Sequence, residues 1–187
     1  MHSFPMRLFL VALLTIAGSC LTLAASSHTF DLPDHGALTF SVPDGWTDQL
    51  KQPPYRLPPT IFLKPRDGAG GAVLITAIWP IAPATKMPDD DTIRSQVVTS
   101  AKKIEPQSVE GRLALQELKG KNGRGFYFAP TDRAPNPGEY KYLTQGIIRV
   151  GDIALSFTVL TNDGEEAVVK AALDTLRTAT YQPSAAI

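Results

Sequence analysis

Aromatic and arginine side chains gather in and around two proline-rich stretches of the sequence, residues 52–59 and 130–139. Tyrosine, tryptophan and arginine are the residue types that dominate the energetics of protein interfaces. If the two stretches meet in the fold, their side chains would form one binding surface made of loops. The alternative is that the rings cover the sheet edges and pack the loops down. The candidate binding residues are Tyr55, Arg56, Trp79, Tyr127, Arg133, Tyr140 and Tyr142.

Patterns that resemble catalytic motifs are incomplete. Ser100 and Lys103 have the S-x-x-K spacing of serine acyl-transferring enzymes, but the S-D-N and K-T-G elements that those enzymes also need do not occur in the sequence. His28 and His35 are the only histidines beyond the N-terminal segment, and no cysteine lies near them. Neither a structural zinc site nor a Ser-His-Asp triad is therefore favoured. We expect no catalytic residues and no metal ion.

Two further motifs have a structural explanation. Three adjacent aspartates, Asp89–Asp91, place negative charge at the positive end of a predicted helix. They do not suit Ca²⁺, because adjacent carboxylates at a helix start point apart and the ion needs about six to eight converging oxygens. The segment Gly120–Gly125 combines glycines with positive charge, but it joins two predicted strands and does not open a helix. We interpret it as a hairpin turn rather than a phosphate-binding loop, and we expect no cofactor.

The first 27 residues have the features of a signal peptide, with Arg7, an apolar run over residues 8–16 and then small residues. A secretory signal peptidase would cut within residues 24–26. Lipidation at Cys20 is a second route, although apolar residues follow it where a lipoprotein has a polar tether. An uncleaved anchor is a third, and its length of about 18 apolar residues barely spans a bilayer. We expect a periplasmic or secreted chain without a membrane span, or alternatively a lipoprotein tethered through Cys20.

The composition indicates one globular domain. The chain has 187 residues, with 18 basic and 18 acidic side chains, so neither nucleic acid nor an anionic membrane is an expected partner. Cys20 is the only cysteine, which leaves the folded part without a disulfide. We predict a single domain over residues 28–182 and a C-terminal tail over residues 183–187.

The segment 140–160 predicts a long antiparallel hairpin that turns at Gly151-Asp152. In that register Val150 faces Ile153, Ile148 faces Leu155, Gly146 faces Phe157 and Thr144 faces Val159, which makes one face of the hairpin almost entirely apolar. The opposite face pairs Arg149 with Ala154, Ile147 with Ser156 and Gln145 with Thr158, so it is mixed. The bare backbone of Gly146 suits a phenylalanine ring lying across it.

Three further hairpins and two helices complete the prediction. Paired strands are expected at residues 29–32 and 38–42, 60–64 and 72–79, and 113–118 and 124–129. The first helix begins at the aspartates and ends before Pro106, and the second begins at Asp163 with a capping box completed by Glu166. Residues 72–78 are apolar on both faces, which predicts a central strand covered on both sides. The predicted fold class is α+β: a twisted antiparallel sheet built from hairpins, with two main helices packed on it as an α/β/α sandwich.

The segment Phe40–Trp46 reads F-S-V-P-D-G-W and resembles the opening hairpin of the PsbP-like family, which ends in P-x-G-W. The predicted order of elements over residues 29–180 is also similar to that family. The superfamily includes an extrinsic subunit of photosystem II, a Ran-binding nuclear-transport factor and small exported bacterial proteins. The resemblance implies a PsbP-like fold and a role in binding or assembly. It carries over no functional residue, because Trp46 is expected to plug the core and Gly45 to form a turn.

These observations favour a non-enzymatic exported protein that binds an unidentified envelope protein through its loops. Two alternatives remain open at this point: an enzyme, such as a hydrolase, with an unrecognised site, and a carrier of a small molecule in a pocket between sheet and helix. An enzyme needs convergent titratable groups in a cleft, whereas a carrier needs an enclosed apolar cavity.

Overall fold

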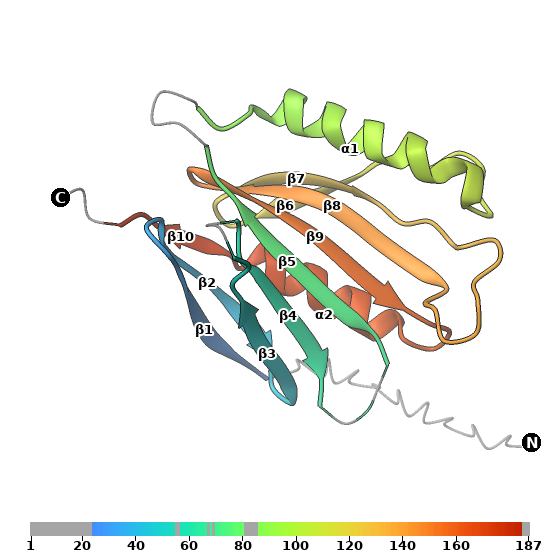
Figure 1. Cartoon of the computed structure of the whole chain (residues 1–187), viewed down its shortest axis with the longest axis horizontal. Helices are drawn as coiled ribbons and strands as arrows, with labels where there is room; N and C mark the ends of the chain where they lie inside the picture. Colours follow the sequence, from blue (N-terminus) through green and yellow to red (C-terminus); the bar gives the residue numbers. More distant parts are fainter. Residues whose placement is uncertain (1–23, 55–56, 67, 69, 81–85, 185–187) are drawn as a thin grey trace, which may run out of the picture.

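The computed structural model describes residues 24–54, 57–66, 68, 70–80 and 86–184. Within these residues the chain forms ten strands, two α-helices and one short 3₁₀ helix (Figure 1). The strands are β1 (Ala25–Leu32), β2 (Gly36–Pro43), β3 (Trp46–Lys51), β4 (Thr60–Pro65), β5 (Ala72–Ile78), β6 (Gln116–Gly120), β7 (Gly123–Phe128), β8 (Tyr142–Val150), β9 (Ile153–Thr161) and β10 (Thr180–Gln182). The helices are α1 (Asp90–Ile104), η1 (Glu105–Gln107) and α2 (Glu166–Arg177).

The strands form two antiparallel sheets, whereas the sequence predicted one. The larger sheet has the order β3-β4-β5-β9-β8-β7-β6, and the smaller has the order β1-β2-β10. The division occurs at Gly45, whose φ of 82° turns the chain out of β2 and sends β3 into the larger sheet. The α+β class is confirmed, with the smaller sheet as an addition.

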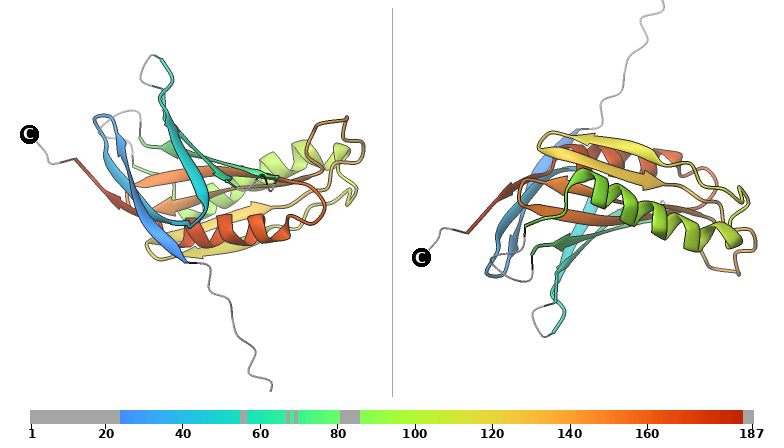
Figure 2. Two further views of the ribbon diagram at one scale, coloured as in Figure 1. Left: turned by 90° about the horizontal axis from the view of Figure 1, so that it is seen from below. Right: turned by 90° about the horizontal axis from the view of Figure 1, so that it is seen from above.

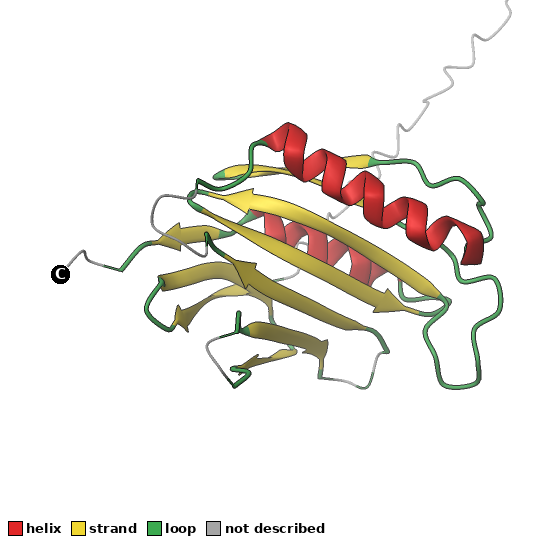
Figure 3. Cartoon of the chain, turned by 45° about the horizontal axis from the view of Figure 1, so that its top comes forward, coloured by secondary structure: helices red, strands yellow, loops and turns green. Residues whose placement is uncertain are grey.

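The two helices lie on opposite faces of the larger sheet, as the sandwich prediction requires (Figures 2 and 3). We call the face under α1 the outer face and the face under α2 the inner face. Buried side chains of α2, the inner face and the smaller sheet form one continuous core. A second, smaller cluster joins α1 to Phe128 of β7 and neighbouring residues on the outer face.

The β8–β9 hairpin has the register predicted for it. All seven predicted pairs occur, from Val150 opposite Ile153 to Thr144 opposite Val159. Gly146 lies opposite Phe157, and both residues are buried on the inner face. Patterning predicted this register because a shift by one residue would turn every apolar side chain to the wrong face.

Four strands differ from the prediction. β6 was expected over residues 113–118 and spans Gln116–Gly120 instead. β1 begins at Ala25 rather than Thr29, so that residues 25–27 of the predicted leader pair with β2. β3 and β10 were missed, because the largely exposed β3 (WTDQLK) has no apolar alternation and β10 has three residues. Trp46 is half-buried at the start of β3 and packs on the core from its margin, so it is not the buried plug that was expected.

The central strand β5 is covered on one face only. Val73, Ile75 and Ala77 are buried on the inner face, whereas Leu74 on the outer face is half-buried and Ile78 is 37% exposed. The prediction of two covered faces was therefore wrong, because α1 lies over β7 and β8 and leaves this part of the outer face without a helix.

The second helix begins at Glu166 rather than at Asp163, and the predicted capping box does not form. Asp163 instead accepts hydrogen bonds from Lys141 and Tyr142, at the start of β8. A reciprocal pair forms one residue earlier than predicted: the Asn162 amide donates to Glu165 Oε2 at 2.8 Å, and the Glu165 amide donates to the Asn162 carbonyl at 3.3 Å. Asp163 therefore bonds to residues distant in the sequence and does not form the capping box that its spacing from Glu166 predicted.

Candidate binding groove

The two proline-rich stretches lie at opposite ends of the larger sheet, so the single loop surface predicted from sequence does not form. Trp79 follows β5, where its ring stacks on His35 with centroids 4.0 Å apart, beside Gln52 at the start of the first stretch. Tyr142 opens β8 at the other end, because it pairs with Thr161, the last residue of β9. The second stretch leads into Tyr142 and shares that end.

The other predicted residues have mainly structural contacts. Tyr127 is buried, and its hydroxyl donates to Gln116 at 2.8 Å. Arg133 donates to the Ser108 carbonyl at 2.8 Å and so joins its loop to the segment after α1. Tyr140 is half-buried in the approach to β8. Tyr55, Arg56 and Cys20 lie outside the described residues.

A groove of about 650 Å³ runs along α2, on the inner face of the sheet. One wall is the flank of α2, and the other wall is formed by the end of β7 and the start of β8. We call it the α2 groove. Its lining residues are Ala129, Pro130, Tyr142, Leu143, Thr144, Thr161, Asn162, Glu166, Val169, Lys170, Leu173, Asp174 and Arg177.

Apolar side chains occupy the middle of the α2 groove. Val169 and Leu173, four residues apart on α2, lie on one flank of the helix and face the groove. Ala129 and Pro130 contribute apolar surface from the opposite wall. Leu173 is only 7% exposed and belongs to the main core, whereas Val169 is half-buried at its margin. The groove is therefore an open extension of the core.

Four charged residues of alternating sign follow one another along the α2 wall: Glu166, Lys170, Asp174 and Arg177. Lys170 Nζ lies 2.7 Å from Asp174 Oδ2, and Arg177 Nη1 lies 2.6 Å from Asp174 Oδ1. Asp174 thus holds both cations at helical spacings of four and three residues. The result is a polar rim without net charge, in which Lys170, Asp174 and Arg177 are paired.

Acid should weaken this rim. Hydrogen bonds from Lys170, and after it Arg177, lower the pKa of Asp174 against the opposing effect of burial. Because the folded-state pKa is depressed, the stabilisation is fully present above the unfolded pKa of about 3.9 and is lost as pH falls through the folded value. Asp174 is 47% exposed, so solvent screening limits the effect to about 0.5 kcal/mol.

We therefore predict that Asp174→Asn lowers the melting temperature by about 1 °C near pH 7, and that this difference shrinks as pH falls below about 4. Thermal unfolding of both proteins across this range measures the difference. Asp152→Asn, in the exposed β8–β9 turn, is the control and should show no such convergence. A difference for Asp174→Asn that stays constant down to about pH 2 would contradict the assignment.

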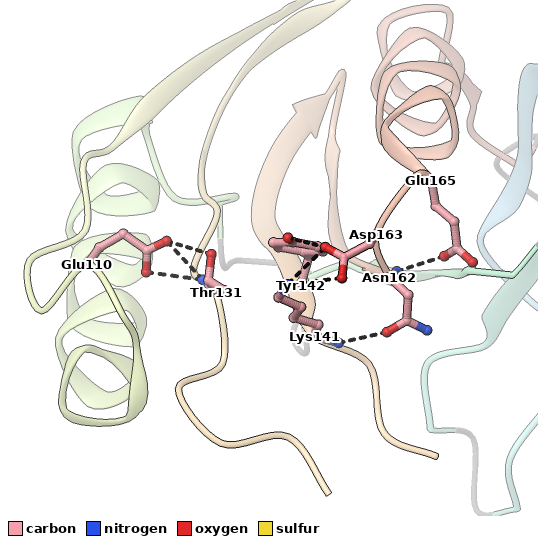
Figure 4. A network of polar contacts seen from close by, with 7 residues as sticks. All are labelled: Glu110, Thr131, Lys141, Tyr142, Asn162, Asp163 and Glu165. Carbon is pink, nitrogen blue, oxygen red and sulfur yellow. Dashed lines mark hydrogen bonds and ion pairs between the residues drawn. The ribbon is translucent and has the colours of Figure 1, made fainter. Parts of the chain in front are cut away.

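A polar network fixes the mouth of the groove where β8 begins (Figure 4). Asp163 accepts from the Tyr142 hydroxyl at 2.6 Å and from Lys141 Nζ at 2.9 Å. These two hydrogen bonds hold the pKa of Asp163 below its usual range, and the bond to Asp163 raises the pKa of Lys141. Asn162 accepts from the Lys141 amide at 3.1 Å. The start of β8 is thereby joined to the segment that precedes α2.

Asp163 and Asp174, beside the α2 groove, are both members of ion pairs. Asp163 and Asp174 have lowered pKa values, whereas a general base or acid that works near neutral pH needs a carboxyl pKa raised towards 7. Among the described residues, no group of three or more histidine, cysteine or acidic side chains could hold a metal ion. The arrangement suits binding by apolar contact with a polar rim.

Tyr142, which the sequence assigned to a loop surface, lines the α2 groove, whereas the sequence reasoning missed the α2 wall. The available signal was the alternation of charge at Glu166, Lys170, Asp174 and Arg177, which marks an exposed helix flank. The sequence did not show that Ala129 and Pro130, directly after β7, lie opposite this flank and form the other wall of the groove.

No family model matches the chain, and no curated protein matches its sequence. The chain is similar to a crystal structure from Bacteroides thetaiotaomicron VPI-5482, with a TM-score of 0.46, 14% identity and 80% of this chain covered. It spans only 46% of the length of that protein. It is also similar to the solution structure of cyanobacterial PsbP from Synechocystis sp. PCC 6803, with a TM-score of 0.49 and 11% identity, covering 88% of this chain and 96% of that one.

At these identities and TM-scores, no ligand, partner or activity of this chain follows from either likeness. Among the described residues, no helix is long and apolar enough to cross a membrane.

Proposed function

We propose that the protein is a non-enzymatic binding protein of the cell envelope, which holds a short apolar segment of a partner protein in the α2 groove. The observation that carries the proposal is the groove itself, which has an apolar floor and, along α2, a charged rim whose residues Lys170, Asp174 and Arg177 are paired. Binding sites on proteins commonly combine such an apolar centre with a polar margin.

The shape of the groove favours a chain segment. Its α2 wall runs from Glu166 to Arg177, which are 11 residues apart and therefore about 16 Å apart along the helix axis at about 1.5 Å per residue. An extended chain of about five residues has the same length. Val169 and Leu173 would contact alternate apolar side chains of such a segment, while the charges of the rim meet its polar ends.

A small apolar molecule is the second candidate occupant. The volume of about 650 Å³ falls within the range of about 300–1,000 Å³ that is usual for small-molecule sites. Native mass spectrometry of the protein recovered from cells distinguishes the two occupants. A ligand of fixed small mass that is lost from a groove variant would support a carrier.

The variant pair Val169→Lys and Ala167→Lys tests the proposal. Val169 lines the groove, whereas Ala167 is exposed on α2 outside it. Short peptides selected from a display library against the wild-type protein, after depletion against Val169→Lys, should be apolar. We expect Val169→Lys to weaken their binding at least about tenfold, because a charge would occupy the apolar centre.

Binding of the selected peptides to Ala167→Lys should equal that of the wild type, and both variants should unfold cooperatively. Equal loss of affinity in the two variants would place the peptide elsewhere, and failure to select any peptide that the groove variant rejects would contradict the proposal.

Export of the chain is part of the same proposal. The first 27 residues carry the features of a signal peptide, and β1 pairs with β2 from Ala25 onwards, so a cut after Ala24 leaves the whole strand intact. The intact mass and N-terminal residue of the protein from an envelope fraction test this. A first residue within 25–27 supports a freely diffusing domain, an acylated Cys20 supports a lipoprotein, and an intact Met1 in the cytoplasm contradicts export.

A further inference from the structure

Three cationic side chains lie side by side across one end of the larger sheet. Lys119 of β6 pairs with Arg124 of β7. In the β7–β8 register Gly125 lies opposite Ile148, which brings Arg124 beside Arg149 at the adjoining position. The β6–β7 and β8–β9 turns meet at this end, where the Gly151 amide donates to the Asn122 carbonyl at 3.2 Å (Figure 1).

This row of like charges has few internal partners. Arg124 Nε lies 2.9 Å from Glu117 and 3.9 Å from Asp90. Among the described residues, no ion pair within 4.0 Å includes Lys119 or Arg149, and Arg149 Nε donates to the Gly151 carbonyl instead. Like charges directly opposite each other on neighbouring strands destabilise a sheet. Asp90 and Glu117 compensate part of this repulsion at Arg124, and a bound anion would compensate more of it at Lys119 and Arg149.

The three cations line a cleft of about 560 Å³ on the outer face, near the first turn of α1. Gly123 and Gly151, one from each turn, line the same cleft. Asp90 also lines it, so the lining groups carry three positive charges against one negative charge. Two further carboxylates lie beside the row, because Glu117 is ion-paired with Arg124 and, after the hydrogen bonds from Thr92, the charge of Arg149 helps to lower the pKa of Asp89. The α2 groove lies on the inner face, so the two sites are separate.

We propose that this cleft binds a phosphate group. Two guanidinium groups on neighbouring strands offer planar donor pairs that match phosphate oxygens, and Lys119 adds a point charge beside them. Arg124 is 53% exposed, so the interaction is screened and depends on salt. A soluble phosphate compound and the phosphate of a lipid headgroup share this chemistry.

The sequence motif Gly120–Gly125 was interpreted as a hairpin turn, and it is one. The cationic row depends on Arg149, 25 residues further along the chain, which the register of β8 brings to the turn. The row of positive charges therefore includes one residue, Arg149, that lies outside the motif.

Thermal unfolding in inorganic phosphate, compared with NaCl at the same ionic strength, tests the proposal. Phosphate should raise the melting temperature of the wild type saturably, because binding stabilises the folded state by mass action. The double variant Arg124→Gln/Arg149→Gln should lose this response, with at least a tenfold weaker apparent affinity. Without phosphate its melting temperature should be close to that of the wild type, since the variant loses the exposed Arg124–Glu117 ion pair together with the like-charge pair. Lys102→Gln/Lys103→Gln, at the exposed end of α1, removes the same charge and should respond like the wild type.

The source of the phosphate is identified by sedimentation with phosphatidylcholine vesicles, with and without phosphatidic acid. Co-sedimentation that requires phosphatidic acid and is lost in the Arg124→Gln/Arg149→Gln variant assigns the site to a lipid headgroup. A saturable response to inorganic phosphate without co-sedimentation assigns it to a soluble compound. The proposal is overturned if the wild type responds to neither probe, or if the variant keeps the full response to both.

Discussion

Replacing Gly146 by alanine is expected to lower the free energy of unfolding by about 3 kcal/mol. A β-carbon at this position would meet the Phe126 carbonyl oxygen, Tyr127 Cβ at 2.6 Å and Phe157 Cζ at 2.8 Å. The carbonyl belongs to the β7–β8 pairing and cannot withdraw without breaking it. Urea unfolding followed by circular dichroism measures the loss.

Gly138→Ala provides the matched control. Gly138 has a φ of 88° and no atom within 4 Å of its added β-carbon, so alanine there pays only for an unfavourable backbone angle, about 1 kcal/mol. A smaller loss for Gly146→Ala than for Gly138→Ala would mean that β8 does not pack against Tyr127 of β7 and Phe157 of β9 as described.

Replacing Phe157 by alanine should cost about 4 kcal/mol, the usual range for truncating a fully buried phenylalanine. The ring is 0% exposed in the main core, lies across Gly146 and is 6.4 Å from the Tyr127 ring between centroids. The cavity that alanine would leave is lined by apolar side chains, so water does not fill it and its cost remains. The same unfolding measurement gives the value.

Phe62→Ala deletes the same atoms from the outer face of β4. Phe62 is half-buried, and its ring packs under Lys51 Nζ at 4.3 Å. Its truncation should cost about 1 kcal/mol, because the ring is partly in water already. If the two truncations cost the same, the inner face would not be the core.

Local patterns were sufficient for most of the hairpins. The β8–β9 register could be predicted because nine-residue strands with one apolar face allow only one pairing that buries that face. The hairpin turns and the start of α1 also followed from local chemistry, with Asp89 Oδ1 accepting from the Thr92 amide at 2.8 Å as a helix cap.

Features that depend on distant parts of the chain could not be predicted. β10 exists because β2 has a free edge after Gly45 diverts the chain, and nothing within its three residues indicates a strand. Asp163 has the spacing of a capping residue, but Lys141 and Tyr142 compete for its carboxylate from 21 or 22 residues away.

The candidate site was only partly predictable for the same reason. Tyr142 was identified by residue type, and it does line the α2 groove. Trp79 was assigned to the same surface as Tyr142, although the register of the strand pairs places the two residues at opposite ends of the sheet. In the sequence, Val169 and Leu173 have the spacing of any apolar helix stripe. Only the folded structure places Ala129 and Pro130 opposite them, which makes the helix flank one wall of a groove.

Site-specific photocrosslinking in cells that produce the protein tests the central claim most directly. A photoreactive residue in place of Lys170, at the rim of the α2 groove, should give a discrete crosslinked adduct with a partner protein, because the side chain is 80% exposed beside the proposed segment. The same residue in place of Ala167, exposed on α2 outside the groove, should give none, and Val169→Lys should abolish the adduct at position 170. Equal adducts from both positions, or an adduct that survives Val169→Lys, would contradict binding in the groove.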